Sequence, residues 1–334
     1  MKTNHGLTLS RAAWDQVQGP IKKDLEQVDQ LLAELFRSPI GLVEQVGRHF
    51  LATRGKKFRP TLLLLIARLD GPAREDDVTA ATVVELIHAA ALIHDDSVDR
   101  SALRRGLPTV NRIWNDDVAI VIGDFLYSKA FETMVHEGLH DAMAVMANVT
   151  HQMSIGMALE LEHEGRLEMT EADYLDIIDA KTATLMAGAC RIGSLKGEDA
   201  DRSERLYKFG EAVGMAFQIA DDVFDFLGDP AETGKRLGTD LREGKITLPL
   251  IRTLDQLRGA RKERARELAG KRKLRKAEFQ ELVDLIEQGD GFGYALARAN
   301  DYADLAKGYL ETEPSGDIRQ ALEQAVDYSI ARTN

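Results

Sequence analysis

The sequence predicts an all-α protein, a single large bundle of about ten or more helices around a central cavity. Apolar residues recur at spacings of three and four, as from Val78 to His94, whereas the alternation typical of a strand is rare. The chain is also rich in Ala, Leu, Met and Glu, which favour helix. The further segments with these properties are residues 117–135, 141–164, 171–195, 203–227 and 278–312.

Local signals predict where helices begin and end. Thr170, followed by Asp173, resembles a capping box, and Pro60 is placed to open another helix. The breaks are short and fall at Gly71-Pro72, Arg105 to Pro108, Gly228 to Pro230, Gly234 and Gly289 to Gly293. None is long enough for a domain linker. We therefore expect residues 1–334 to form a single all-α domain, with residues 1–24 as an N-terminal extension.

The overall composition argues against several classes of protein. A formal net charge of −12 is unfavourable for a general nucleic-acid binder, which needs a positive surface. The single cysteine, Cys190, cannot form an internal disulfide. The first ten residues lack the apolar core of a secretory signal, and the densest apolar run, Thr61 to Ala67, is too short to span a bilayer. We expect a cytoplasmic protein without a transmembrane segment.

Two clusters of the form Asp-Asp-x-x-Asp carry the functional signal. They are Asp95-Asp96-Ser97-Val98-Asp99 and Asp221-Asp222-Val223-Phe224-Asp225, and each follows an apolar helical segment. Their spacing gathers three carboxylates near one face of a helix, where like charges repel. Mg²⁺ offsets such repulsion and prefers a few carboxylates together with waters and phosphate oxygens. A single cluster is better explained as a solvated helix end, but two of the same form predict a pair of sites that face one cavity.

Other catalytic chemistries lack their residues. The sequence holds no Gly-x-Ser-x-Gly elbow for a serine nucleophile and no His-Glu-x-x-His for zinc. Its eight histidines are scattered.

Basic residues accompany both acidic clusters. Four cations lie between Arg54 and Pro60, Arg104 and Arg105 follow the first cluster, and Lys235, Arg236 and Lys245 follow the second. Arg suits bidentate contact with phosphate, and Lys acts as a point charge. Any one group alone would be read as surface charge. Their repeated pairing with acidic clusters predicts binding of two diphosphates, one of them bridged by metal.

These motifs resemble the trans-type isoprenyl diphosphate synthase (polyprenyl synthetase) family, over roughly residues 25–325. Gly55 to Pro60 is similar to its Gly-Gly-Lys-Arg-x-Arg-Pro segment, with Arg54 in place of the first Gly. Phe217 to Asp225 is similar to its second aspartate-rich motif. Further matches are Glu85-Leu86-Ile87-His88, Arg104-Arg105-Gly106, Lys181-Thr182, Gly234-Lys235, Gly238-Thr239-Asp240-Leu241 and Glu243 to Leu250.

The resemblance implies the isoprenoid synthase type of bundle and a role for each matched residue. Two or three Mg²⁺ ions would bridge to an allylic diphosphate from Asp95, Asp99 and Asp221, with Asp96, Asp222 and Asp225 in support. The allylic diphosphate would be held by Arg104, Lys181 and Lys235. Isopentenyl diphosphate would be bound by Lys56, Arg59, His88 and Arg105, with Thr182 and Lys245 as further substrate-binding residues and Phe217 and Gln218 near the reacting carbons. The implied catalytic set is Asp95, Asp96, Asp99, Arg104, Lys181, Gln218, Asp221 and Lys235.

The implied reaction is a head-to-tail 1′–4 condensation. Ionisation of the allylic diphosphate releases pyrophosphate and gives a cation, the double bond of isopentenyl diphosphate attacks it, and a proton is then lost to the released pyrophosphate. Water must be excluded, because it would quench the cation. The resemblance also implies a homodimer, for which the apolar helices from 117 to 160 would supply an interface.

Chain length is predicted from the turn before the first aspartate cluster. In this family bulky aromatic residues there stop growth at short products, whereas this chain has Ala90 and Ala91, with Ile87 behind them. We expect an open shaft and a long all-trans product such as a quinone side-chain precursor. A floor built by Ile87, Val83, Met153 or Met157, and hence a geranylgeranyl or farnesyl product, is the alternative.

Rival functions differ at the aspartates. A terpene cyclase would carry Asn/Asp-x-x-Ser/Thr-x-x-x-Glu as its second motif, and a squalene synthase would carry Asp-x-x-Glu-Asp. A non-catalytic partner subunit of a heteromeric synthase typically loses aspartates, whereas all six are present here. Gly156-Met157-Ala158-Leu159-Glu160 departs from the Gly-Glu-x-x-Gln of many long-chain members, so substrate contacts there stay open.

Overall fold

The protein, seen here in a computed structural model, is described at residues 8–9, 11–52, 55–197, 199–228 and 237–333. It is built almost wholly of α-helices, which confirms the predicted fold class. Within the described residues, strands form only two short ladders, β1 with β4 in parallel and β2 with β3 antiparallel. The elements are β1 (Thr8–Leu9), α1 (Arg11–Gln18), α2 (Lys22–Leu35), α3 (Gly41–Ala52), α4 (Phe58–Leu69), α5 (Glu75–Val98), β2 (Leu103–Arg104), β3 (Leu107–Pro108), α6 (Val110–Ile113), α7 (Asp116–His136), α8 (His140–His163), α9 (Glu171–Ile178), α10 (Thr184–Ser194), α11 (Ala200–Leu227), α13 (Thr239–Glu243), α14 (Leu248–Gln256), α15 (Gly259–Ala269), α16 (Lys276–Gln288), α17 (Gly291–Tyr309), α18 (Asp317–Ile330) and β4 (Arg332–Thr333).

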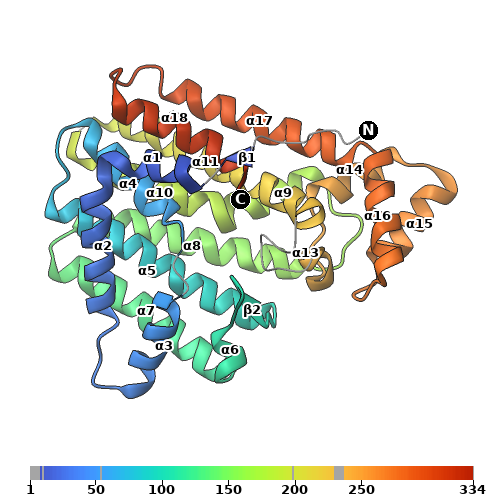
Figure 1. Ribbon diagram of the computed structural model, residues 1–334, viewed down its shortest axis with the longest axis horizontal. Coiled ribbons are helices and arrows are strands. Elements are labelled where there is room, and N and C mark those ends of the chain that lie inside the picture. Colours follow the sequence, from blue (N-terminus) through green and yellow to red (C-terminus); the bar gives the residue numbers. More distant parts are fainter. Residues whose placement is uncertain (1–7, 10, 53–54, 198, 229–236, 334) are drawn as a thin grey trace.

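The long helices lie side by side in layers (Figure 1). α5 packs between α4 and α7, and α10 packs against α4, α8 and α11. α17 and α18 cover α11 at the top of the view, and α15 and α16 lie together at one end. The two helices that carry the aspartate clusters, α5 and α11, are thereby both in the interior of the bundle.

α4 and α5 are buried because they are apolar on nearly every side. The run from Thr61 to Ala67 is completely enclosed. Among the described helices, α5 alone is long and apolar enough to cross a membrane, and 72% of its apolar window is buried inside the protein. Burial of that kind is a property of core helices in general.

The helix boundaries follow the predicted signals closely. The Thr170 hydroxyl accepts a hydrogen bond from the Asp173 amide at 3.2 Å, and the Asp173 carboxylate accepts one from the Thr170 amide at 2.9 Å. This capping box opens α9, as predicted. Residues 278–312 divide into α16 and α17 at the predicted glycine break.

Residues 171–195 do not form one regular helix. A π-helical turn, Asp179–Ala183, separates α9 from α10. Two glycines let neighbouring helices press against this turn. A Cβ at Gly156 of α8 would lie 2.5 Å from the Lys181 nitrogen, and a Cβ at Gly214 of α11 would lie 2.5 Å from the Ala183 Cα. Such turns are frequent at functional sites, and this one carries Lys181 and Thr182.

Candidate active site

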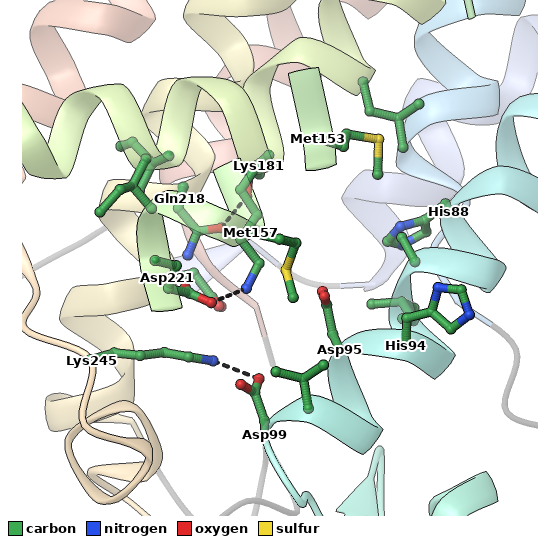
Figure 2. A pocket seen from close by; sticks show the side chains of 18 of the residues that line it. His88, His94, Asp95, Asp99, Met153, Met157, Lys181, Gln218, Asp221 and Lys245 are labelled. Atoms are coloured by element: carbon green, nitrogen blue, oxygen red, sulfur yellow. Dashed lines mark hydrogen bonds and ion pairs between the residues drawn. The ribbon is translucent and has the colours of Figure 1, made fainter. Parts of the chain in front are cut away.

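A cavity of about 1790 Å³ opens between α5, α7, α8, α10 and α11. Pockets for ordinary small molecules measure roughly 300–1,000 Å³, so this space suits more than one small ligand. Figure 2 shows Asp95 and Asp99 on one wall, with Lys181, Gln218 and Asp221 opposite and Lys245 reaching in from a loop. The cavity therefore unites residues that lie more than one hundred positions apart in the sequence.

Four aspartates of the two predicted clusters line the cavity: Asp95 from α5, Asp99 directly after the end of α5, and Asp221 and Asp222 from α11. Burial raises the pKa of Asp95, and the neighbouring Asp99 raises it further. Among the described residues, no three acidic, His or Cys side chains are grouped closely enough to hold a metal unaided. Carboxylates facing one another across a polar cavity fit a hard cation that takes its other ligands from water and phosphate.

Asp96 has a different place from the one predicted. It is buried, does not line the cavity, and holds Arg104 through hydrogen bonds of 2.8 to 3.0 Å to both carboxylate oxygens. A carboxylate engaged by a guanidinium on both oxygens has little capacity left for a metal. Asp96 is thus better described as the residue that orients Arg104, whose side chain does line the cavity.

Asp222 and Asp225 are also held by the protein. Asp222 accepts hydrogen bonds of 2.7 Å from the Tyr174 hydroxyl and from the Gln218 amide, and burial raises its pKa to about 7. Asp225 lies off the cavity and accepts the backbone N–H groups of Thr239 and Asp240 at 3.1 and 3.2 Å. These contacts fix the start of α13, so Asp225 anchors the loop beyond it.

Gln218 is the middle member of a hydrogen-bonded row. The Thr182 hydroxyl donates to its amide oxygen at 3.0 Å, and its amide nitrogen donates to Asp222. The π-helical turn is therefore linked directly to the second aspartate cluster. Sequence reasoning missed Tyr174, which completes this row from α9.

Two lysines neutralise the acidic wall. Lys181 pairs with Glu160 at 2.5 Å, and Lys245 pairs with Asp99 at 2.6 Å and with Glu243 at 2.8 Å. Glu160 stands in the segment where the sequence departs from the family pattern, and its pairing with Lys181 could not be read from the sequence. Lys235, predicted as a catalytic and substrate-binding residue, lies outside the described residues, as do Arg54 and Gly234.

The predicted basic residues gather on another side of the cavity. Lys56, Arg59, His88 and Arg105 all line it. Burial lowers the pKa of His88 well below its usual value, so the neutral ring accepts a hydrogen bond from Arg59 at 3.1 Å. The Nε atom of Arg59 is buried and has no hydrogen-bond partner among the described residues. An anion would satisfy this group of cations.

The apolar part of the cavity follows α7 and α8. Of the three residues predicted to set chain length, only Ala91 lines it. Ala90 and Ile87 are completely buried and lie off the cavity, because they point to a different side of α5 from Ala91. Its walls there include Tyr127, Phe131, Met153 and Met157. Met153 and Met157 are among the floor residues that the sequence suggests for the short-product alternative, whereas Tyr127 and Phe131 are not.

Comparison with known proteins identifies a family. A family model described as polyprenyl synthetase matches residues 41–286. A short chain isoprenyl diphosphate synthase of Methanothermobacter thermautotrophicus is 34% identical over 95% of this chain and 99% of its own. An octaprenyl diphosphate synthase of Haemophilus influenzae is 31% identical over 95% and 97%, respectively.

A solved structure is similar over nearly the whole chain. The polyprenyl synthase of Caulobacter crescentus, complexed with calcium and isoprenyl diphosphate, superposes with a TM-score of 0.90 at 34% identity. The match covers 98% of both chains.

Proposed function

The chain belongs to the polyprenyl synthetase family of prenyltransferases, and we propose that it joins an allylic diphosphate to isopentenyl diphosphate by head-to-tail 1′–4 condensation. The observation that carries this proposal is the division of one cavity into three parts. Asp95, Asp99 and Asp221 face one part, and apolar side chains enclose another. The remaining part is faced by the basic residues Lys56, Arg59 and Arg105 together with His88. Two diphosphates and one hydrocarbon chain require those three environments.

The acidic part would bind the allylic diphosphate through a divalent cation. Asp95, Asp99 and Asp221 would hold Mg²⁺, which when bound neutralises charge on the departing pyrophosphate. Lys181 and Lys245 already lie among these carboxylates and would donate hydrogen bonds to the same leaving group. Their positive charge stabilises the charge that builds up as the carbon–oxygen bond breaks.

The basic part would bind the diphosphate of isopentenyl diphosphate. Arg59, Arg105 and Lys56 supply the positive charge, and neutral His88 keeps Arg59 oriented. Phe217 and Gln218 lie between the two parts, on α11 one turn before Asp221. They would face the reacting carbons, where an aromatic ring excludes water and shields the allylic cation.

The product proposed is a long all-trans polyprenyl diphosphate. Ala91 leaves the cavity open beside the first aspartate cluster, and the space continues along α7 and α8. The similar proteins include both a short-chain and an octaprenyl synthase, so family membership does not decide the length. On this proposal, product length would depend on Phe131, Met153 and their neighbours, which line this part of the cavity.

A homodimer is proposed from the outer faces of the same two helices. α7 exposes Val121 and Val135, and α8 exposes Ile155, none of which lines the cavity. Large exposed apolar side chains on adjacent helices are typical of a protein interface. Sedimentation equilibrium of the purified protein measures the assembly, and a monomer at micromolar concentration would contradict it.

The test is incubation with Mg²⁺, isopentenyl diphosphate and allylic primers of several lengths, followed by separation of the dephosphorylated products. Asp95→Asn and Asp221→Asn should abolish elongation, whereas Asp173→Asn, at the α9 cap outside the cavity, should not. Circular dichroism would establish that the variants fold. Absence of elongation with every primer would refute the proposed enzymatic activity and would favour the alternative of a non-catalytic partner subunit. A product that ends at farnesyl or geranylgeranyl would refute only the long-chain part.

A further inference from the structure

The irregular segment before α4 is held by the N-terminal helix. The backbone carbonyl of Lys56 accepts a hydrogen bond from the Trp14 indole N–H at 2.9 Å and another from the Gln18 side-chain amide at 3.0 Å. Gln18 also donates to the hydroxyl of Thr61 in the first turns of α4. α1 thus spans the junction between the Lys56 segment and the helix that follows it.

Aromatic stacking fixes the same segment from both sides. The Trp14 ring is almost completely buried and stacks on Phe58 at a centroid distance of 5.0 Å and an interplanar angle of 6°. Its other neighbour is Tyr328 of α18, at 4.5 Å. Phe58 in turn lies 5.9 Å from Phe217, beside Gln218 in the cavity. A row of four rings therefore connects the C-terminal helix to the centre of the cavity.

Lys56 lies directly on this row. Its ammonium group is 4.9 Å from the centroid of the Tyr328 ring, within cation–π range, and both residues line the cavity. Its neighbour Lys57 has a left-handed backbone with φ of 52° and is tied to Asp29 of α2 at 2.5 Å. A short loop in this conformation has no regular hydrogen bonding of its own, so its shape depends on the contacts around it.

On the basis of the function proposed above, we propose that Trp14, Gln18 and Tyr328 are positioning residues for isopentenyl diphosphate. Trp14 and Gln18 fix the Lys56 backbone through its carbonyl, and the Tyr328 ring aims the Lys56 ammonium into the cavity. The residues expected from the sequence to be an N-terminal extension would then belong to the substrate-binding apparatus. None of the three needs to touch the acidic wall, so their effect should be confined to one of the two substrates.

The experiment separates the two substrates and the two kinds of contact. Trp14→Phe keeps a stacking ring and removes the N–H donor, whereas Gln18→Met removes the amide and keeps the length. Tyr328→Leu removes the ring, and Tyr328→Phe keeps it. Phe36→Leu is the matched control, since Phe36 is a buried aromatic residue that packs on Phe50 and does not line the cavity.

Three measurements are made on the full-length protein. Initial rates are recorded with each substrate varied in turn, the dissociation constant of isopentenyl diphosphate is measured by calorimetry, and stability is measured by urea unfolding. Trp14→Phe should raise KM and Kd for isopentenyl diphosphate by about 3- to 10-fold, the range expected for one hydrogen bond. Gln18→Met should raise both at least as much, because it removes the hydrogen bonds to the Lys56 carbonyl and to the Thr61 hydroxyl. KM for the allylic diphosphate should stay within about twofold. Tyr328→Phe should recover most of the affinity that Tyr328→Leu loses.

The outcomes distinguish this inference from the proposed function. Unchanged affinity for isopentenyl diphosphate in all these variants, or equal losses for both substrates that Phe36→Leu reproduces, would overturn the positioning role and leave the function intact. A wild-type protein that binds isopentenyl diphosphate without elongating any primer would refute the enzyme, while the ratios of Kd still decide the positioning role. A wild-type protein that neither binds nor elongates would overturn both.

Discussion

The π-helical turn at Asp179–Ala183 is wedged between two glycines, and a single methyl group would displace it. In Gly156→Ala the new Cβ would lie 2.5 Å from the Lys181 nitrogen and 2.8 Å from its Cα. Non-bonded atoms rest at about 3.5–4.0 Å, so the turn must move by about 1 Å. The far side offers no relief, because Gly214 of α11 is packed equally tightly on Ala183.

The displacement should cost activity more than stability. Overpacking of a core costs about 1–3 kcal/mol, which a protein of this size can tolerate while remaining folded. A misplacement of about 1 Å in a catalytic group can cost about 100-fold in rate. The Lys181 ammonium would leave its position beside Asp95, and Thr182 would pull on Gln218 through their 3.0 Å hydrogen bond. We therefore expect Gly156→Ala to lower kcat about 100-fold.

Gly188→Ala is the matched control for this prediction. It adds the same methyl group in α10, on the other side of the contact with α8, where the Cβ would meet the side chains of Val149 at 2.5 Å and Met146 at 2.9 Å. Both variants should lose stability in urea unfolding, and only Gly156→Ala should lose kcat. The reasoning is refuted if the two variants are equally destabilised and Gly156→Ala keeps kcat within about threefold of the wild type.

Three further changes test other parts of the cavity. Burial raises the pKa of Asp222, and the hydrogen bond from Tyr174 opposes that rise, so Tyr174→Phe should raise this pKa above about 7. The acidic limb of the plot of kcat/KM against pH should then move to higher pH. An unmoved limb would show that this contact is unimportant. Desolvation lowers the pKa of Lys56 to about 8, so KM for isopentenyl diphosphate should rise up to about tenfold per pH unit above pH 8 as the ammonium is lost. Lys56→Arg should remove that rise, because Arg keeps its charge in this range. The same rise in the variant would refute a role for the Lys56 charge. Ala91→Phe should shorten the product, because the larger side chain would fill the cavity beside Asp95. Chromatography of the dephosphorylated alcohols measures product length. An unchanged length would show that Ala91 does not border the growing chain.

The sequence contained the local part of the fold. Helical periodicity, the capping box at Thr170 and the glycine break at Gly289 depend on neighbouring residues, and each appears where it was expected. The π-helical turn did not follow from the sequence, because its residues have an ordinary helical composition. The turn packs against Gly156 and Gly214, which belong to other helices and are far from it in the sequence.

The same distinction applies to the cavity. The types and spacing of the aspartates predicted which helices would face it, but not which carboxylates would be free. Arg104 donates hydrogen bonds to the carboxylate of Asp96, and Tyr174 donates one to that of Asp222. Both donors come close to these carboxylates only through tertiary packing. Ala91 faces the cavity and Ala90 does not, because consecutive residues of a helix point about 100° apart and the shaft follows only one direction.

The ion pairs of Lys245 with Asp99 and of Lys181 with Glu160 have a thermodynamic consequence. In the free protein these lysines and carboxylates neutralise one another. A divalent cation that bound alone would have to displace a lysine from its carboxylate, and an anion that bound alone would have to draw a lysine away and leave the carboxylate unpaired. If both arrived together, the lysines would be available to pair with the anion and the carboxylates to hold the cation. Cation and diphosphate should therefore strengthen each other's binding by the same factor, as reciprocal linkage requires. The cavity should therefore have a high affinity for the cation and the diphosphate together and a low affinity for either alone.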